Sequence, residues 1–553
     1  MSDSSAGPSP TQPTEPAPPA AEPTLADKVR PGYVFEGPAL ELGALMVDAT
    51  TQSDVAIRIP LAMLNRHGLV AGATGTGKTK TLQLMAEQLS AYGVPVFAAD
   101  VKGDLSGLST PGEASERVTE RAAAVGQAWA PTGYPVEYFA IGGEGTGVPL
   151  RATMSSFGPT LLSRVLGLNE TQESSLGLVF HYADKAGLPL LDLADLRAVV
   201  QHLVSAEGKG ELKELGGLSS ATAGVILREL IGFADQGADA FFGEPELDTR
   251  DLIRVAPDGR GVISLVELPN LQDRPAVFST FLMWLLADLF HDLPEVGDPD
   301  KPSLVFFFDE AHLLFTDASK DFLTAITQTV RLIRSKGVGV VFVTQSPTDV
   351  PDDVLAQLGS RIQHQLRAHT PRDAKALRAT VETYPHSAYD DLGEVITSLG
   401  IGEAIVTVMN ERGAPTPVAW TRLPAPQSRM GPADPAAMTA AVEGSSLHAT
   451  YAATIDRESA REKLAQRLEQ GAAKAEAEEA EAKEQKSAKT EKSAGTATAP
   501  RTDRVSYPAP SRAPSSPQAD SMVTEVLKSQ AAKEFMRTAA REIARGVFGT
   551  GRR

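Results

Sequence analysis

Short apolar runs alternate with amphipathic stretches through the first part of the chain. The runs at 67–71, 95–99 and 138–141 have the length and the apolar character of strands. Over 81–92, between the first two runs, apolar residues recur with a helical period. A strand, a glycine-rich loop, a helix and a second strand in this order predict the βαβ unit of a parallel sheet.

The same alternation returns in the second half of the chain. Strands are expected at 262–268, 304–308 and 338–343, and helices at 277–293 and 321–335. The run at 304–308 is uninterrupted, as expected for a strand that is buried on both faces of a parallel sheet. The two series together predict an α/β fold with a parallel-rich sheet.

The segment between the two series has a different pattern. Long amphipathic stretches such as 192–204 fill it, and strand signals are few. We expect a mostly helical insertion over 155–245, which divides the core into halves at 26–154 and 246–430. Alternating apolar and glycine or proline residues at 33–37 predict short strands that lead into the first half.

Polar and low-complexity sequence marks both ends of the chain. Residues 1–25 are rich in proline, serine and alanine, and such sequence buries too little surface to offset chain entropy, so a disordered tail is expected. Residues 431–520 have low complexity, and an alanine-, glutamate- and lysine-rich part at 452–492 predicts a long solvated helix. Residues 521–549 regain an amphipathic period. They predict a helix that docks on the chain's own core or on a neighbouring subunit rather than on a membrane or nucleic acid.

Composition narrows the class of protein. The 553 residues include no cysteine, which excludes disulfides, thiolate metal sites and cysteine nucleophiles. The net charge of -18 argues against non-specific attraction to nucleic acid or anionic membranes, although local basic patches remain compatible with it. The N-terminal residues lack the apolar core of a targeting signal, and the most apolar stretch, 276–290, is too short to span a membrane and contains Asp288. We therefore expect a cytoplasmic protein without a membrane partner.

The segment Gly72–Thr79 matches the P-loop pattern G-x-x-x-x-G-K-T at every position. Its glycines allow backbone N–H groups to surround phosphate oxygens, and the positive end of the following helix points at the same anion. Lys78 is expected to contact the β- and γ-phosphates of ATP, and the Thr79 hydroxyl to bind Mg²⁺. A dinucleotide site would need a glycine at the position of Lys80, so we reject it. The expected phosphate cradle consists of Gly72, Ala73, Thr74, Gly75, Thr76, Gly77, Lys78, Thr79 and Lys80.

Two carboxylates follow the apolar run at 304–308. Asp309 is expected to bind Mg²⁺, and Glu310 to polarise the attacking water. A cap at the start of a helix is the alternative interpretation of this pair. Together with the P-loop, however, the pair favours hydrolysis of a nucleoside triphosphate.

Three further segments have both a catalytic and a plain structural interpretation. Gln345 follows the strand at 338–343, where it either senses the γ-phosphate or belongs to an ordinary turn. Arg331 and Arg334 either reach the phosphates of a neighbouring subunit or lie on a solvated helix face. The stretch Asp100–Asp104 stands at the carboxyl edge of the sheet, where it is either part of the site or a simple turn.

Taken together, four motifs resemble the HerA/FtsK superfamily, and most closely its bacterial HerA-like proteins of undefined role. The resemblance extends over about 26–430 and the C-terminal helix. The motifs that carry it are Gly72–Thr79, Ala99–Gly107, Phe308–His312 and Val343–Pro351.

The resemblance implies a RecA-like core that hydrolyses Mg-ATP, and often a hexameric ring that translocates on double-stranded DNA. By the same resemblance, Gln345 takes the sensor position and Arg334 that of an arginine finger acting on a neighbouring subunit. A DNA channel would require local basic residues, and the candidates are Arg361, Arg367, Arg372, Lys375 and Arg378.

Two functions remain open from the sequence. The first is an oligomeric ATP-driven motor or helicase that acts on DNA. The second is an ATP-switched oligomeric binding module that does not unwind DNA and assembles through 521–549. Transfer of phosphate to a small substrate is disfavoured because no acceptor-site motif is present. No protein partner is indicated.

Overall fold

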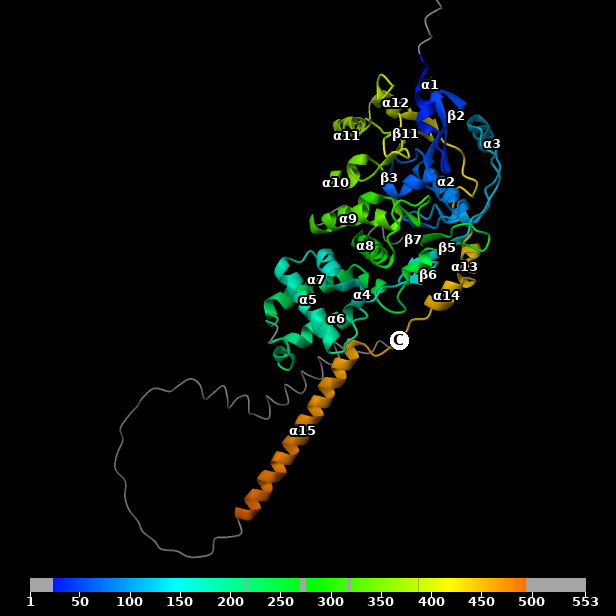
Figure 1. Cartoon of the computed structure of the whole chain (residues 1–553). Coiled ribbons are helices and arrows are strands. Elements are labelled where there is room, and N and C mark those ends of the chain that lie inside the picture. The colour runs from blue at the N-terminus through cyan, green and yellow to red at the C-terminus, as the bar shows by residue number, and fades with distance from the viewer. Residues whose placement is uncertain (1–22, 214–215, 269–274, 316–319, 386, 494–553) are drawn as a thin grey trace, which may run out of the picture. The chain divides into compact units, whose positions relative to one another are not determined.

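The computed structural model describes residues 23–213, 216–268, 275–315, 320–385 and 387–493 (Figure 1). The chain divides into two compact units. Unit 1 consists of Met1–Leu150 and Leu247–Ala452, and unit 2 of Arg151–Glu246 and Ala453–Arg553. The predicted helix at 521–549 and most of the predicted disordered tail lie outside the described residues.

A large mixed sheet forms the centre of unit 1. Among the described residues it has 12 strands in the order β2-β1-β12-β11-β10-β3-β9-β8-β4-β7-β5-β6. The strands are β1 (Ala39–Val47), β2 (Thr50–Pro60), β3 (Gly68–Ala71), β4 (Val96–Asp100), β5 (Val136–Ile141), β6 (Val148–Leu150), β7 (Ile263–Glu267), β8 (Leu304–Phe308), β9 (Val338–Thr344), β10 (Ser360–Gln363), β11 (Glu403–Thr407) and β12 (Ala419–Arg422).

The part of the sheet from β10 to β6 is parallel throughout. Its central strands β3, β8 and β9 are buried along their whole length, as their apolar sequences require. Ala71, the last residue of β3, pairs with Thr344 of β9 on one side and with Gln363 of β10 on the other. Because parallel strands end at the same edge, the segments that follow β3, β4, β8 and β9 converge there. The predicted α/β fold with a parallel-rich sheet is confirmed.

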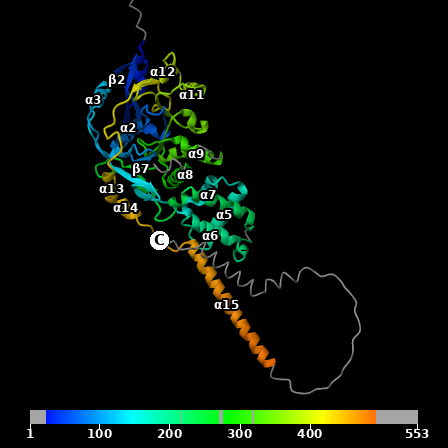
Figure 2. The ribbon, with the colours of Figure 1, turned by 180° about the vertical axis from the view of Figure 1, so that it is seen from behind.

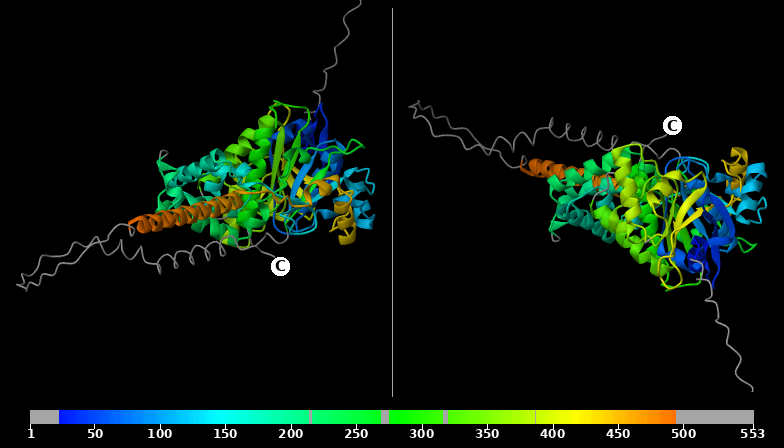
Figure 3. Two further views of the ribbon diagram at one scale, coloured as in Figure 1. Left: turned by 90° about the horizontal axis from the view of Figure 1, so that it is seen from below. Right: turned by 90° about the horizontal axis from the view of Figure 1, so that it is seen from above.

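Three helices of unit 1 belong to the crossovers that join these parallel strands: α2 (Lys78–Ala91), α8 (Pro275–Asp292) and α9 (Lys320–Ile333). The chain runs from β3 to β4 in one direction across the sheet, and from β7 to β8 and from β8 to β9 in the other. Since such crossovers are right-handed, α2 covers one face while α8 and α9 cover the opposite face. Helices α8 and α9 pack on each other, and Figure 3 shows helices on both sides of the strands.

The remaining helices of unit 1 surround this core. Helices α13 and α14 pack on β5 and β6 respectively and lie side by side in Figures 1 and 2, so unit 1 extends past the boundary expected at residue 430. The helices are α1 (Leu25–Val29), α3 (Glu116–Val125), α10 (Asp352–Leu355), α11 (Pro371–Glu382), α12 (Leu392–Ser398), α13 (Pro435–Glu443) and α14 (Ser446–Tyr451).

The short strands predicted at 33–37 are wrong. Arg30–Tyr33 forms a 3₁₀ helix with proline in its first turn, and the first strand begins only at Ala39. Tyr33 is buried, and its hydroxyl shares its one proton between the carbonyl oxygens of Val406 and Pro417, at 3.0 and 2.7 Å. One tyrosine therefore anchors this segment without a hydrogen-bonded ladder. The antiparallel extension formed by β2, β1, β12 and β11 was not predicted.

Unit 2 is helical in the residues that the structure describes. Its helices are α4 (Met154–Val165), α5 (Glu170–Lys185), α6 (Leu193–Val204), α7 (Ser220–Asp235) and α15 (Ala460–Ser493). The start of α15 is held by Asp195, which accepts a hydrogen bond from the Arg461 amide at 3.0 Å, and Leu464 is buried. The described side chains of α15 beyond Leu464 are mostly exposed, as expected for the solvated helix at 452–492. No helix in the described ranges is long and apolar enough to cross a membrane.

Candidate nucleotide-hydrolysis site

The loop between β3 and α2 has the backbone geometry of a phosphate cradle. Gly72, Gly75 and Gly77 have φ angles of 156°, 82° and 116°, which side chains rarely permit. A Cβ atom at Gly72 would lie 2.5 Å from the Cβ of buried His364, so close packing also requires glycine there. Gly77 precedes the first turn of α2 and no side chain caps that turn, so its N–H groups can bind an anion.

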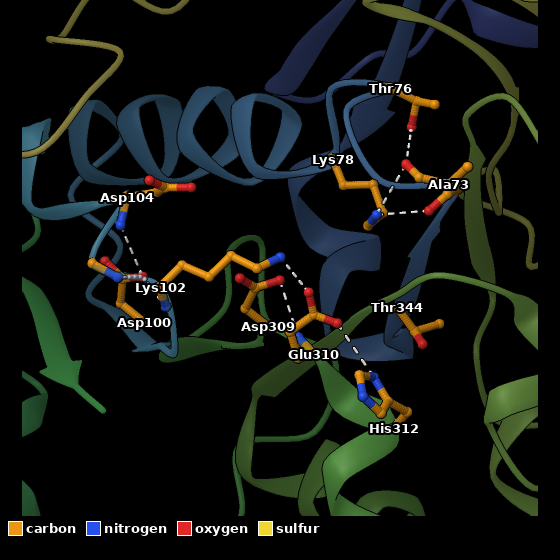
Figure 4. A network of polar contacts seen from close by, with 12 residues as sticks. Ala73, Thr76, Lys78, Asp100, Lys102, Asp104, Asp309, Glu310, His312 and Thr344 are labelled. Atoms are coloured by element: carbon orange, nitrogen blue, oxygen red, sulfur yellow. Dashed lines mark hydrogen bonds and ion pairs between the residues drawn. The ribbon is translucent and has the colours of Figure 1, made fainter. Parts of the chain in front are cut away.

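The side chain of Lys78 crosses the mouth of this loop (Figure 4). Its ammonium group donates to the carbonyl oxygens of Gly72 and Ala73, at 2.6 and 3.2 Å. Burial lowers the pKa of Lys78, and the charges of Glu310 and Asp309 oppose that shift. The cation is thus held at the point where the loop surrounds an anion.

Asp309 provides a buried carboxylate at the end of β8. One of its oxygens accepts a hydrogen bond from the Glu310 amide at 3.0 Å, and Oδ2 accepts none from the residues that the structure describes. Burial raises the pKa of Asp309 to about 6, and the negative charge of Glu310 adds to that shift. A cation bound at Oδ2 would compensate both effects. Together with the half-buried Thr79 at the start of α2, these oxygen donors fit Mg²⁺.

Glu310 lies beside Asp309 in a left-handed backbone conformation with a φ angle of 50°. Lys102 contacts its Oε1 atom, and His312 Nδ1 lies 3.3 Å from its Oε2 atom. The contact with His312, and then the ion pair with Lys102, lowers the pKa of Glu310 to about 2, and the pKa of His312 rises in return. Glu310 is therefore an ionised carboxylate at neutral pH.

Neither Lys102 nor His312 was given a role of its own from the sequence. Lys102 belongs to the stretch Asp100–Asp104, which was left open between a part of the site and a simple turn, and His312 ends the motif Phe308–His312 that carried part of the resemblance. The available signal for Lys102 was its place immediately after a buried strand, at the same sheet edge as Asp309.

Gln345 is exposed on the wall of a cavity of about 630 Å³ beside the P-loop. The cavity is also lined by Ala73 and Thr74, so the structure brings Gln345 to the phosphate loop. Its neighbour Thr344 donates to Asp349 Oδ2 at 2.9 Å, which fixes the turn that carries Gln345. The arrangement is compatible with a sensor of the γ-phosphate.

Two of the basic residues expected in a DNA channel also line this cavity. They are Arg367, which donates to the Thr74 carbonyl oxygen at 3.4 Å, and Arg372. Arg361 instead lies on β10 and donates to the Thr383 carbonyl oxygen at 2.9 Å. Arg367 and Arg372 therefore lie beside the phosphate loop of their own chain.

Arg334 and Lys80 are not brought into the cradle. Arg334 precedes β9, so it lies at the amino end of a strand whose carboxyl end faces the P-loop, roughly 20 Å away at the usual rise per residue. It contacts Asp298 at 3.4 Å. The Lys80 ammonium donates to Gln83 Oε1 at 3.2 Å on the same helix. Within one chain, Arg334 is thus remote from the phosphates.

Strand β3, which leads into the P-loop, and strand β8, which is followed by Asp309 and Glu310, lie on either side of β9. The polar residues that follow all three strands lie at one edge of the sheet. This fold and this site define an ATP-hydrolysing P-loop NTPase with a RecA-like core. The family model described as "Helicase HerA-like C-terminal" matches residues 45–553, and the chain belongs to that family.

Two curated relatives are similar to the chain, and both are named "DNA double-strand break repair helicase HerA". The protein from Saccharolobus solfataricus is 20% identical over 66% of this chain and 66% of its own length. The protein from Sulfolobus acidocaldarius is 23% identical over 72% of each. The chain thus spans about two thirds of the length of the first relative.

Among solved structures, the plasmid coupling protein TrwB in complex with ADP and Mg²⁺ is 18% identical to the chain. The match covers 73% of this chain and 99% of that one, with a TM-score of 0.48.

Proposed function

We propose that the protein is a Mg²⁺-dependent ATPase that works as a ring-forming motor or helicase on double-stranded DNA. The observation that carries the proposal is the convergence of Lys78, Asp309, Glu310 and Gln345 on one edge of a parallel sheet. Binding, activation of water and sensing of the γ-phosphate each have a group there.

The roles follow from the geometry. Lys78 and the first N–H groups of α2 bind the β- and γ-phosphates of ATP. Thr79 and Asp309 hold Mg²⁺, which neutralises phosphate charge when it is bound. Glu310 accepts a hydrogen bond from the attacking water and so orients it towards the γ-phosphate.

A homo-oligomer is proposed because the resemblance to the HerA/FtsK superfamily expects an arginine finger at Arg334, and its own chain places this residue away from the phosphate loop. Arg334 is half-buried at the opposite edge of the sheet, where it can reach only the phosphates bound by another copy. A ring of identical subunits, with a hexamer as the expected size, supplies one such arginine to every site.

DNA is proposed as the track because both curated relatives carry the name of a DNA repair helicase. The net charge of -18 requires that DNA contacts be local and basic. Lys375 and Arg378 on α11 are exposed and available for that role.

The test combines ATP turnover and molecular size. Turnover with Mg²⁺ should rise when duplex DNA is added, and the rise should shrink steeply as salt increases. Light scattering with an ATP analogue and DNA should show an assembly larger than the monomer. ATP turnover that no tested DNA changes would favour the alternative, an ATP-switched oligomeric binding module without unwinding activity. A monomer under all conditions would contradict both.

A further inference from the structure

The carboxylate of Glu310 is held on both sides by basic side chains from different parts of the fold. Lys102 reaches its Oε1 atom from the loop after β4, and His312 Nδ1 lies 3.3 Å from Oε2 (Figure 4). The Glu310 side chain is 8% exposed, whereas that of Lys102 is 40% exposed. The carboxylate of the Lys102–Glu310 ion pair is therefore shielded from solvent. A shielded ion pair holds its side chains in place better than one at an open surface.

The loop that presents Lys102 is stiffened by a buried carboxylate. Both oxygens of Asp100 accept backbone N–H groups of the loop, from Lys102 and Asp104 at 3.2 Å, from Gly103 at 2.8 Å and from Leu105 at 2.7 Å. Asp100 itself is fully buried. Since its oxygens bind four successive amides, the position of the loop is set by the end of β4.

Strands β4 and β8 are direct neighbours, and Ala99 pairs with Phe308. The loop after β4 therefore lies beside the turn after β8, where Glu310 has its left-handed backbone conformation. His312 comes from the same short turn as Glu310 and moves with it. Lys102 is the contact that ties the Glu310 carboxylate to a separate, rigid strand end.

We propose that Lys102 is a positioning residue that aims Glu310 at the attacking water, with Asp100 holding the loop that carries it. The proposal rests on the proposed ATPase function and adds a residue to its machinery. The ion pair occupies one oxygen of Glu310 from one side and leaves the other lone pairs of the carboxylate for water. Without Lys102 the carboxylate would rotate away from the reacting geometry, a displacement that is costly for catalysis even when it is small.

The proposal predicts that loss of the Lys102 charge lowers kcat but leaves KM nearly unchanged. Lys102→Met keeps an unbranched side chain that is one atom shorter and removes the charge, and Lys102→Arg keeps the charge. With Mg²⁺ and ATP, Lys102→Met should lower kcat by about ten- to a hundredfold and leave KM within about twofold. Lys102→Arg should recover most of the lost kcat. Lys28→Met removes an exposed lysine on α1 and should change neither constant.

A double-mutant comparison distinguishes positioning from direct contact with phosphate. If Lys102 acts only through Glu310, adding Lys102→Met to Glu310→Gln should cause no further loss of kcat. An additional loss, or a raised KM that Lys102→Arg does not restore, would overturn the proposal in favour of a phosphate contact. An unchanged or higher kcat in Lys102→Met would overturn it as well.

Two controls keep this test independent of folding and of the wider proposal. Circular dichroism and binding of a fluorescent ATP analogue verify each variant, and Lys102→Gln replaces Lys102→Met if the latter does not fold. Absence of turnover in the wild type would remove the proposed ATPase itself. If the wild type hydrolyses ATP and both Lys102→Met and Lys102→Gln do so at the same rate, only the proposed role of Lys102 is wrong.

Discussion

The ammonium group of Lys78 lies 2.6 Å from the carbonyl oxygen of Gly72, on the far side of the loop that its own helix closes. The lysine thus reaches across the phosphate loop from the first turn of α2 to the first glycine of the loop. Its burial means that few alternative positions exist for the charge. Binding of phosphate requires this cation to exchange carbonyl oxygens for phosphate oxygens.

Lys78→Ala should therefore lower both analogue affinity and turnover. Removing one preorganised charge from such a site costs on the order of a hundredfold in rate or more. Equilibrium binding of a fluorescent ATP analogue and steady-state phosphate release measure the two effects. Lys28→Ala, which removes an exposed lysine, serves as the control. Wild-type affinity in Lys78→Ala would mean that the backbone N–H groups alone bind the phosphates.

Glu310→Gln should separate binding from hydrolysis. The amide is isosteric and can keep a contact to Lys102 through its oxygen, but it cannot polarise water as a carboxylate does. We expect analogue affinity close to that of the wild type, and a kcat lower by about a hundredfold or more. Single-turnover measurements with saturating enzyme check the chemical step. Near-normal hydrolysis would assign the activation of water to another group.

The elements around the P-loop could be predicted because each carries its signal within a few residues. The strand β8 is a run of five apolar residues followed by two carboxylates, and α2 begins at the end of the glycine pattern. The contact between Lys102 and Glu310 was not predicted because it has no such local signal. Lys102 and Glu310 are 208 positions apart, and only the pairing of β4 with β8 makes them neighbours.

His364 was missed for a related reason. It lies under the P-loop because β10 pairs with β3, and its Nε2 atom lies 2.8 Å from the Thr81 hydroxyl. A single histidine directly after a short strand has no pattern of its own. The antiparallel strands β11 and β12 are as short as β3 and β8, and over such lengths periodicity does not separate strand from loop. They were missed because no glycine loop or carboxylate pair follows them to mark their ends.

His67 should make the stability of unit 1 depend on acid. Its Nδ1 atom accepts a hydrogen bond from the Val340 amide at 3.0 Å, so Nε2 carries the proton that it donates to the Val330 carbonyl oxygen at 2.7 Å. The bond that Nδ1 accepts needs the neutral ring, and burial lowers the pKa of His67 to about 4. Because the folded pKa lies below the unfolded value, the stabilisation is complete above about pH 6.5 and is lost as the pH falls towards 4.

The comparison of wild type with His67→Gln isolates this effect from other titrating groups. The difference in unfolding free energy should shrink by on the order of 2 kcal/mol between pH 7.5 and pH 5. Urea titrations followed by tryptophan fluorescence measure it, since Trp129, Trp284 and Trp420 all belong to unit 1. A difference that is constant with pH would show that the pKa of His67 is the same in the folded and the unfolded protein.

Arg334 allows a test of action between subunits. Its position at the amino end of β9 keeps it away from its own phosphate loop, so Arg334→Ala should leave analogue binding by the isolated chain intact. In the assembled protein the loss of a guanidinium at a neighbour's γ-phosphate should lower turnover on the order of a thousandfold. Mixtures of two inactive variants then separate action between subunits from action within one chain. Arg334→Ala keeps a working phosphate loop and Lys78→Ala keeps Arg334, so a site of the first variant beside a subunit of the second is complete. Equal mixtures should recover about a quarter of the wild-type turnover, whereas each variant alone stays inactive. Mixtures as inactive as the separate variants would return Arg334 to a solvated position paired with Asp298.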